Sequence, residues 1–152
     1  MEILIKNQQK IRKINQRKIR EIVKKALQFL KVDEKTEVSI LFTDDKFIRS
    51  LNNKYREIDK PTDVLSFSLR EGPVKTPEAE SDKLLGDIII SIETAQRQTD
   101  DLKHSIEKEL TVLLIHGLLH LTGYAHEEDK DYKTMREKER EILKSFDLPP
   151  DV

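Results

Sequence analysis

The sequence predicts a single α+β domain over residues 1–152, with a small mixed sheet of four strands packed with about five helices. The length is that of one domain, which can bury roughly two-thirds of its unfolded surface in a core. Four short segments have the alternating or β-branched pattern of strands, and five longer ones repeat apolar residues at helical spacing. No repeat or linker divides the chain.

The strands are predicted from their apolar residues. Val38, Ile40 and Phe42 alternate with more polar neighbours, the pattern of a strand with one face more deeply buried. The β-branched run Ile88–Ile90 indicates a central strand that is buried on both faces. The predicted strands are Glu2–Lys6, Val38–Phe42, Asp63–Leu69 and Leu84–Ile92.

The helices are predicted from apolar spacing and from capping residues. The first runs from Ile11 to Leu30, and the second follows Asp44 as N-cap and cannot pass Pro61. A third begins near Glu93, and residues 71–83 form an exposed loop between the last two strands. The fourth helix is predicted to be capped by His104–Ser105, and the last to span Asp129–Phe146 and to stop before Pro149–Pro150. The residues expected to face inward are Phe47, Ile48, Leu51 and Tyr55 in the second helix, and Tyr132, Met135, Ile142, Leu143 and Phe146 in the last.

Composition limits the class of protein. The chain has no cysteine, which excludes a disulfide scaffold and every thiolate-ligated metal site, and leaves histidine as the soft ligand. No stretch approaches the ~20 apolar residues of a membrane span, and the N-terminus lacks the pattern of a signal peptide. We expect a soluble cytoplasmic protein with no membrane partner.

Charge is distributed unevenly along the chain. Residues 1–30 carry nine Lys and Arg against two Glu, a local charge of +7, so the rest carries −8 of the total of −1. Lys13, Arg17 and Arg20 belong to this basic segment and could contact the phosphates of RNA. A solvated helix face explains the same charges, so both interpretations stay open.

Three of the four histidines lie between His116 and His126. His116 and His120 are four residues apart, so on a helix they share one face and can bind one ion. Gly123 can take the left-handed conformation that ends a helix and lets the chain bring His126 back toward the pair. Three imidazoles leave a fourth position open, which is typical of a catalytic zinc site.

The spacing of these histidines equals that of the metzincin peptidases. Those enzymes need a glutamate directly after the first histidine as general base, and this chain has Gly117 there. The sequence therefore predicts a metal site without that base.

Beyond the histidines, several blocks in order resemble the YbeY family of single-strand-specific endoribonucleases. The resemblance implies a zincin-like metal-binding helix and a role in ribosomal RNA maturation and ribosome quality control. It places the metal ligands at His116, His120 and His126, and a functionally important arginine at Arg56. The blocks are Leu51-Asn52, Tyr55-Arg56, Asp59, Pro61 to Phe67, Leu85 to Ile88, His104-Ser105, Glu109-Leu110, and Met135 with Glu139.

Two positions depart from the family pattern. Ala125 stands where the family usually has Asp before the third histidine, and Ser68 stands where it has Pro. A carboxylate beside a metal ligand can orient its imidazole, and Glu127 or Glu128 could substitute for the missing one.

The resemblance implies cleavage of single-stranded RNA, with ribosomal RNA or a ribosomal subunit as partner and no DNA. One zinc ion is the expected cofactor, and nickel or another divalent metal would also suit imidazole ligands. Arg56 is the candidate catalytic residue, since its guanidinium can bind two phosphoryl oxygens. The alternative is a purely structural role for Arg56, in a salt bridge with Asp59 or Asp63. Ser66 and Asp87, at strand ends, are candidate substrate contacts, although a purely structural role for them is also open.

Three further expectations complete the prediction. His104 is expected to cap a helix or bond backbone, because it lies more than three helical turns from His116. Another zinc hydrolase, such as a peptidase, is one alternative function. A ribosome-assembly factor with a mainly structural metal is the other.

Overall fold

The computed structural model describes residues 1–69, 84–123 and 129–146. The predicted loop at 71–83, the predicted helix stop at Pro149–Pro150 and the side chain of Tyr132 lie outside this part of the chain. Within it, no helix is long and apolar enough to cross a membrane.

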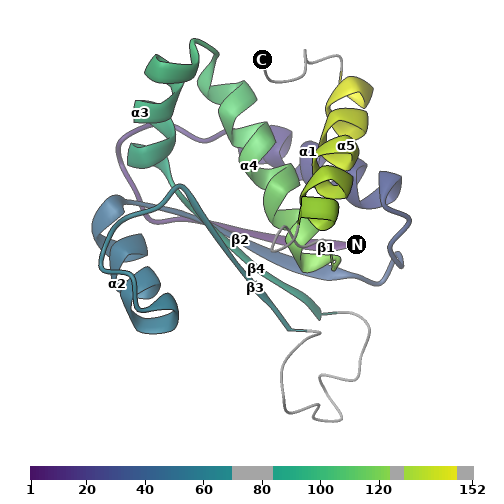
Figure 1. Ribbon diagram of the computed structural model, residues 1–152, viewed down its shortest axis with the longest axis horizontal. Helices are drawn as coiled ribbons and strands as arrows, with labels where there is room; N and C mark the ends of the chain where they lie inside the picture. Colours follow the sequence, from purple (N-terminus) through teal and green to yellow (C-terminus); the bar gives the residue numbers. More distant parts are fainter. Residues whose placement is uncertain (70–83, 124–128, 147–152) are drawn as a thin grey trace.

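A four-stranded mixed sheet and five helices form the described fold, as the sequence predicts (Figure 1). The strand order is β1-β2-β4-β3, with β1, β2 and β4 parallel and β3 antiparallel to β4. The strands are β1 (Glu2–Asn7), β2 (Glu37–Thr43), β3 (Val64–Ser68) and β4 (Leu84–Ser91). The helices are α1 (Gln16–Phe29), α2 (Asp45–Arg56), α3 (Ile92–Leu102), α4 (Ile106–Leu121) and α5 (Asp129–Ser145).

The two faces of the sheet are covered differently. Helices α1, α4 and α5 lie on one side and α2 on the other (Figure 1). The main core lies between the sheet and α1 and α4, where Ile88, Ile90 and Leu114 are fully buried. This burial confirms that β4 is a central strand.

The first helix begins later than predicted, at Gln16 instead of Ile11. Asn15 is its N-cap and accepts from the Lys18 backbone N–H at 3.2 Å. Before this helix, the Gln9 side-chain oxygen accepts from the backbone N–H groups of Ile11 (2.8 Å) and Arg12. The Gln9 side-chain nitrogen donates to the backbone carbonyl of Arg12. These bonds satisfy the backbone in a non-helical turn, so the apolar residues before position 15 do not extend the helix.

The prediction that Phe47 and Tyr55 face inward is wrong. Their exposed fractions are 38% and 57%, whereas Ile48 of the same helix is fully buried. Ile48 packs with Leu65 and Ile89 in a small cluster on β3 and β4. Helix α2 therefore covers only part of this face, and its outer side chains border a cavity instead of a core.

Asp45 ties the start of α2 to the end of β4 and the start of α3. Its carboxylate accepts from the hydroxyls of Ser91 and Thr94, both at 2.6 Å, and pairs with Arg97 at 2.8 Å. Burial alone would raise the pKa of Asp45, but these three partners together hold that pKa below its usual value. The backbone N–H of Asp45 donates to the Glu93 side chain at 2.9 Å, so both the backbone and the side chain of Asp45 bond to residues at the start of α3.

Candidate metal centre

Helix α4 holds His116 and His120 on one side, as their spacing predicts. Ser105 caps the helix by accepting from the Lys108 backbone N–H at 3.1 Å, so Ser105 is the capping residue of the predicted pair His104–Ser105. Both histidines are half-buried. Their Nε2 atoms are 3.0 Å apart, and the rings cross at 75° with centroids 4.6 Å apart.

The convergence of these two nitrogens suits two ligands of one ion. Two nitrogens bound to one tetrahedral zinc at 2.0–2.1 Å lie about 3.3 Å apart, close to the separation of the His116 and His120 Nε2 atoms. In the described part of the chain, no group of three or more His, Cys, Asp or Glu is arranged to hold a metal. The third predicted ligand, His126, lies outside the described residues, as do Ala125, Glu127 and Glu128.

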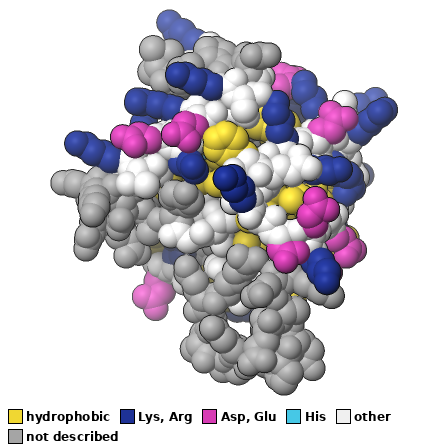
Figure 2. All heavy atoms as spheres, turned by 90° about the vertical axis from the view of Figure 1, so that its right-hand side faces the viewer, with side chains coloured by type: hydrophobic (Ala, Val, Ile, Leu, Met, Phe, Trp, Pro, Cys, Tyr) yellow, Lys and Arg dark blue, Asp and Glu magenta, His cyan; other side chains and the backbone are white. Residues whose placement is uncertain are grey.

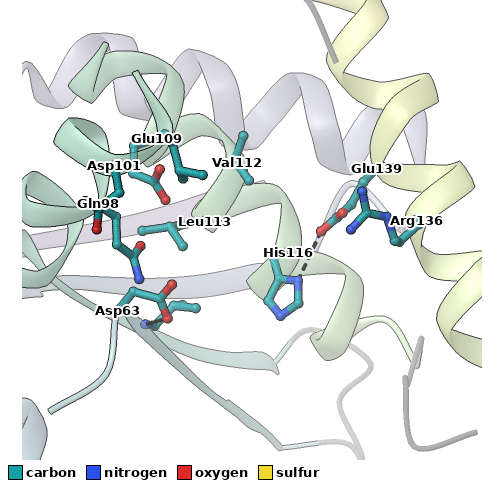
Figure 3. A pocket seen from close by; sticks show the side chains of 11 residues that line it. Asp63, Gln98, Asp101, Glu109, Val112, Leu113, His116, Arg136 and Glu139 are labelled. Carbon is teal, nitrogen blue, oxygen red and sulfur yellow. Dashed lines mark hydrogen bonds and ion pairs between the residues drawn. The ribbon is translucent and has the colours of Figure 1, made fainter. Parts of the chain in front are cut away.

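A carboxylate from another helix contacts the other nitrogen of His116. Glu139 of α5 places Oε1 3.0 Å from His116 Nδ1, across 23 residues of sequence. Figure 3 shows this contact at one end of a cavity of about 460 Å³ between α3, α4, α5 and the start of β3. Metal-binding histidines commonly have such a carboxylate on the nitrogen that faces away from the ion.

Most of the ionisable side chains that line the cavity beside His116 are acidic. Asp63, Asp101, Glu109 and Glu139 line it, with Arg136 as the cationic side chain among the described lining residues (Figure 3). The arrangement favours cations over free anions, because carboxylates repel phosphate.

His104 contacts Glu109, one of the residues that line this cavity. Its Nε2 is 2.5 Å from the Oε2 of Glu109, and both side chains are almost fully buried, with exposed fractions of 8% and 3%. The pair fixes the start of α4.

Gly117 faces the sheet. A Cβ at this position would lie 3.0 Å from Ile88 Cδ1 and 3.1–3.2 Å from two other Ile88 carbons. The glycine thus allows α4 to pack closely on β4. A glutamate here would point into the core, so the position that carries the peptidase general base cannot serve that role.

Arg56 ends α2, on the other side of the sheet from α4 (Figure 1). It is exposed, and no ion pair or hydrogen bond joins it to a partner within the described residues. Asp59 pairs instead with Arg49, at 2.8 and 3.2 Å, and these hydrogen bonds lower the pKa of Asp59. Asp63 accepts from the backbone N–H of Val64 at 2.7 Å, so neither aspartate forms the alternative salt bridge.

Ser66 and Asp87 lie on opposite faces of the sheet. Ser66 pairs with Ile88, whose side chain meets Gly117, so Ser66 faces α4 and the histidines. Asp87 lines a second cavity of about 460 Å³ with Tyr55 on the α2 side. The structure therefore brings Ser66, but not Asp87, to the face that carries His116 and His120.

Comparison with known proteins identifies the family. The profile of the family described as Endoribonuclease YbeY matches residues 4–147. The chain belongs to this family. A YbeY relative from Desulforamulus reducens is 46% identical over 130 residues, covering 86% of this chain and 85% of the relative. One from Bacillus cereus is 43% identical over 133 residues, with the same coverage of both chains.

A solved structure has the same fold as this chain. The solution structure of a Thermotoga maritima protein superposes with a TM-score of 0.58 at 25% sequence identity. The superposition covers 95% of this chain and 91% of that one.

The basic residues proposed for RNA contact lie on α1 and just before it, and their surroundings differ. Lys13 lines a small cavity of about 170 Å³ between the start of α1 and the start of α4. Arg17 is exposed beside Glu21, at 3.8 Å, and Arg20 donates to the backbone carbonyl of Ile3. Figure 2 shows Lys and Arg interspersed with Asp and Glu on the side of the molecule that carries α1 and α5. This surface is not uniformly positive.

The sequence alone does not predict that Glu139 contacts His116 or that Arg136 lines the adjacent cavity. Glu139 belongs to the family pattern, but that pattern assigns it no contact. Helical spacing can predict contacts within α4 but not which residue of α5 reaches it.

Proposed function

We propose that this protein is a metal-dependent endoribonuclease that cleaves single-stranded RNA and acts in the maturation of ribosomal RNA. Relatives named Endoribonuclease YbeY support the reaction class. The distance of 3.0 Å between the Nε2 atoms of His116 and His120 supports the location of the metal site. Ribosomal RNA, or a ribosomal subunit, would be the partner, and the cytoplasm the compartment.

His116, His120 and His126 would hold the metal, for which zinc is the first candidate and nickel another. A metal held by these residues would supply a bound water of lowered pKa and a Lewis acid for a phosphoryl oxygen. His116 and His120 lie in the C-terminal half of a largely buried helix, so their rings are held in place before substrate arrives. Such preorganisation reduces the cost of reaching the reactive geometry.

Arg56 would bind phosphate oxygens of the RNA. Its guanidinium is always charged and can bond two oxygens at once. Helix α2 and helix α4 lie on opposite faces of the sheet, and β3 is the edge strand between them. An RNA strand that crosses this edge would contact both Arg56 and the histidines, with Ser66 on the inner face as a further contact.

A matched set of variants tests this function. His120→Ala should lose both bound metal and cleavage of unstructured RNA, while Arg56→Ala should keep the metal. Casein, included in the same assays, should stay intact, because Gly117 provides no peptidase base. Full RNA cleavage by metal-free His120→Ala would exclude the proposal.

The acidic lining of the cavity beside His116 favours a second candidate function. Four carboxylate side chains line it, so RNA could bind elsewhere on a ribosome-assembly factor whose metal is mainly structural. That candidate predicts that metal removal lowers the melting temperature, that RNA association survives, and that intact protein never cleaves RNA. Binding and cleavage measured on one metal-stripped sample separate the two functions.

A further inference from the structure

We propose that Glu139 is a positioning residue of the metal centre, which holds His116 so that its Nε2 faces the ion. The inference rests on the metal binding in the proposed function. Glu139 would not touch the metal or the RNA. It would act through the His116 ring, by fixing which nitrogen carries the proton.

The two nitrogens of His116 have different partners. Nδ1 is 3.0 Å from the Glu139 carboxylate, and Nε2 is 3.0 Å from His120 Nε2. A neutral imidazole has one N–H and one lone pair. A carboxylate accepts only, so Nδ1 carries the proton and Nε2 presents its lone pair toward His120, where an ion shared by both rings would lie.

Packing, and not the contact with His116, places Glu139. The Glu139 side chain is 19% exposed and that of His116 is 32% exposed, so solvent screens this contact less than a surface pair. Met135 and Ile142 lie about one turn before and one turn after Glu139 on α5, and they are 2% and 0% exposed. Their burial in the main core holds α5 against α4 and leaves Glu139 directed at His116 (Figure 3).

The contrast with His104 shows what is particular about this pair. His104 also contacts a glutamate, Glu109, at 2.5 Å, and that pair is more deeply buried. His104 is outside the histidine cluster of the sequence, whereas His116 directs its second nitrogen at another imidazole. A carboxylate on one side and a second imidazole on the other is the arrangement of a metal ligand with an outer hydrogen bond.

Glu139 gives the first predicted metal ligand a carboxylate from a different helix. The contact joins His116 of α4 to α5 across 23 residues of sequence. Docking of α5 and metal affinity would therefore be linked, because a shift of this helix would release the ring that it holds.

The test measures zinc affinity in the full-length protein by competition with a chromophoric chelator. Glu139→Ala should weaken zinc binding about 10- to 100-fold, the usual effect of removing such an outer partner. Glu139→Gln should weaken it less, since the amide oxygen can still accept from Nδ1–H. Glu137→Gln, an exposed position on the same helix, is the matched control and should bind zinc like the wild type.

Melting temperatures of the metal-free proteins separate positioning from simple stabilisation. If Glu139 only joins α5 to α4, the variants would melt earlier but bind zinc as tightly as the wild type, which would overturn the inference. Should Glu139→Ala fail to fold, the near-isosteric Glu139→Gln decides by the same criterion. RNA cleavage is measured on the same samples to test the two proposals separately. If zinc binds tightly and its binding depends on Glu139, but the wild type does not cleave RNA, only the nuclease function is refuted. A wild-type protein without zinc affinity would overturn the inference.

Discussion

Replacing Gly117 by alanine should destabilise the protein, although alanine is the better helix former. In an open helix this change would stabilise by about 1 kcal/mol. Here the new Cβ would lie 3.0, 3.1 and 3.2 Å from three carbons of Ile88. Ile88 is β-branched and fully buried in the central strand, so it cannot swing away. Overpacking of this kind costs about 1–3 kcal/mol, and we expect a net loss of about 1 kcal/mol.

Urea unfolding of the metal-free protein, followed by circular dichroism, measures this loss. For a chain of this size it corresponds to a melting temperature roughly 2–4 °C lower. Ile88→Val removes the closest carbon, so the double variant should lose less stability than the two single changes added together. A Gly117→Ala protein more stable than the wild type would refute the close packing of α4 on β4.

Three other changes test separate parts of the structure. Arg56→Ala should leave zinc content unchanged and reduce RNA cleavage, and unchanged cleavage rates would remove Arg56 from the site. Asp45→Asn should cost about 1–2 kcal/mol at pH 7, because the carboxylate has charge-assisted hydrogen bonds. Since the folded pKa of Asp45 lies below the usual 3.8, this difference should be complete above that value and disappear as the pH falls through the folded pKa, as acid titrations of both proteins would reveal. Lys13→Ala combined with Arg17→Ala should lower the slope of log affinity against log salt for single-stranded RNA by roughly 1.4, and an unchanged slope would show that neither contacts phosphate.

Local patterns predicted most of the fold. The alternation around Ile40 and the β-branched run at Ile88–Ile90 gave β2 and β4, because burial on one or both faces directly shapes strand sequences. The start of α1 was missed, because side-chain bonds from Gln9 stop the helix before apolar spacing does. Tyr55 was misplaced because sequence does not reveal how much of a sheet face its helix covers.

The site was predictable only where its residues are close in sequence. His116 and His120 face each other because four residues make one helical turn. The approach of Glu139 depends on how α5 docks, and local spacing does not contain that information. Ser66 and Asp87 look equivalent in sequence. They lie on opposite faces of the sheet because Ser66 pairs with Ile88, the neighbour of Asp87 on β4, and successive side chains of a strand point to opposite faces.

Metal content and RNA cleavage, determined on one sample of wild-type protein purified without added metal, test the central claim most directly. Elemental analysis should find about one zinc or similar divalent ion per chain, as expected for one three-histidine site. Cleavage of unstructured RNA should stop when the ion is removed by chelation and return when it is restored. Undiminished cleavage by protein that contains no metal would contradict the account.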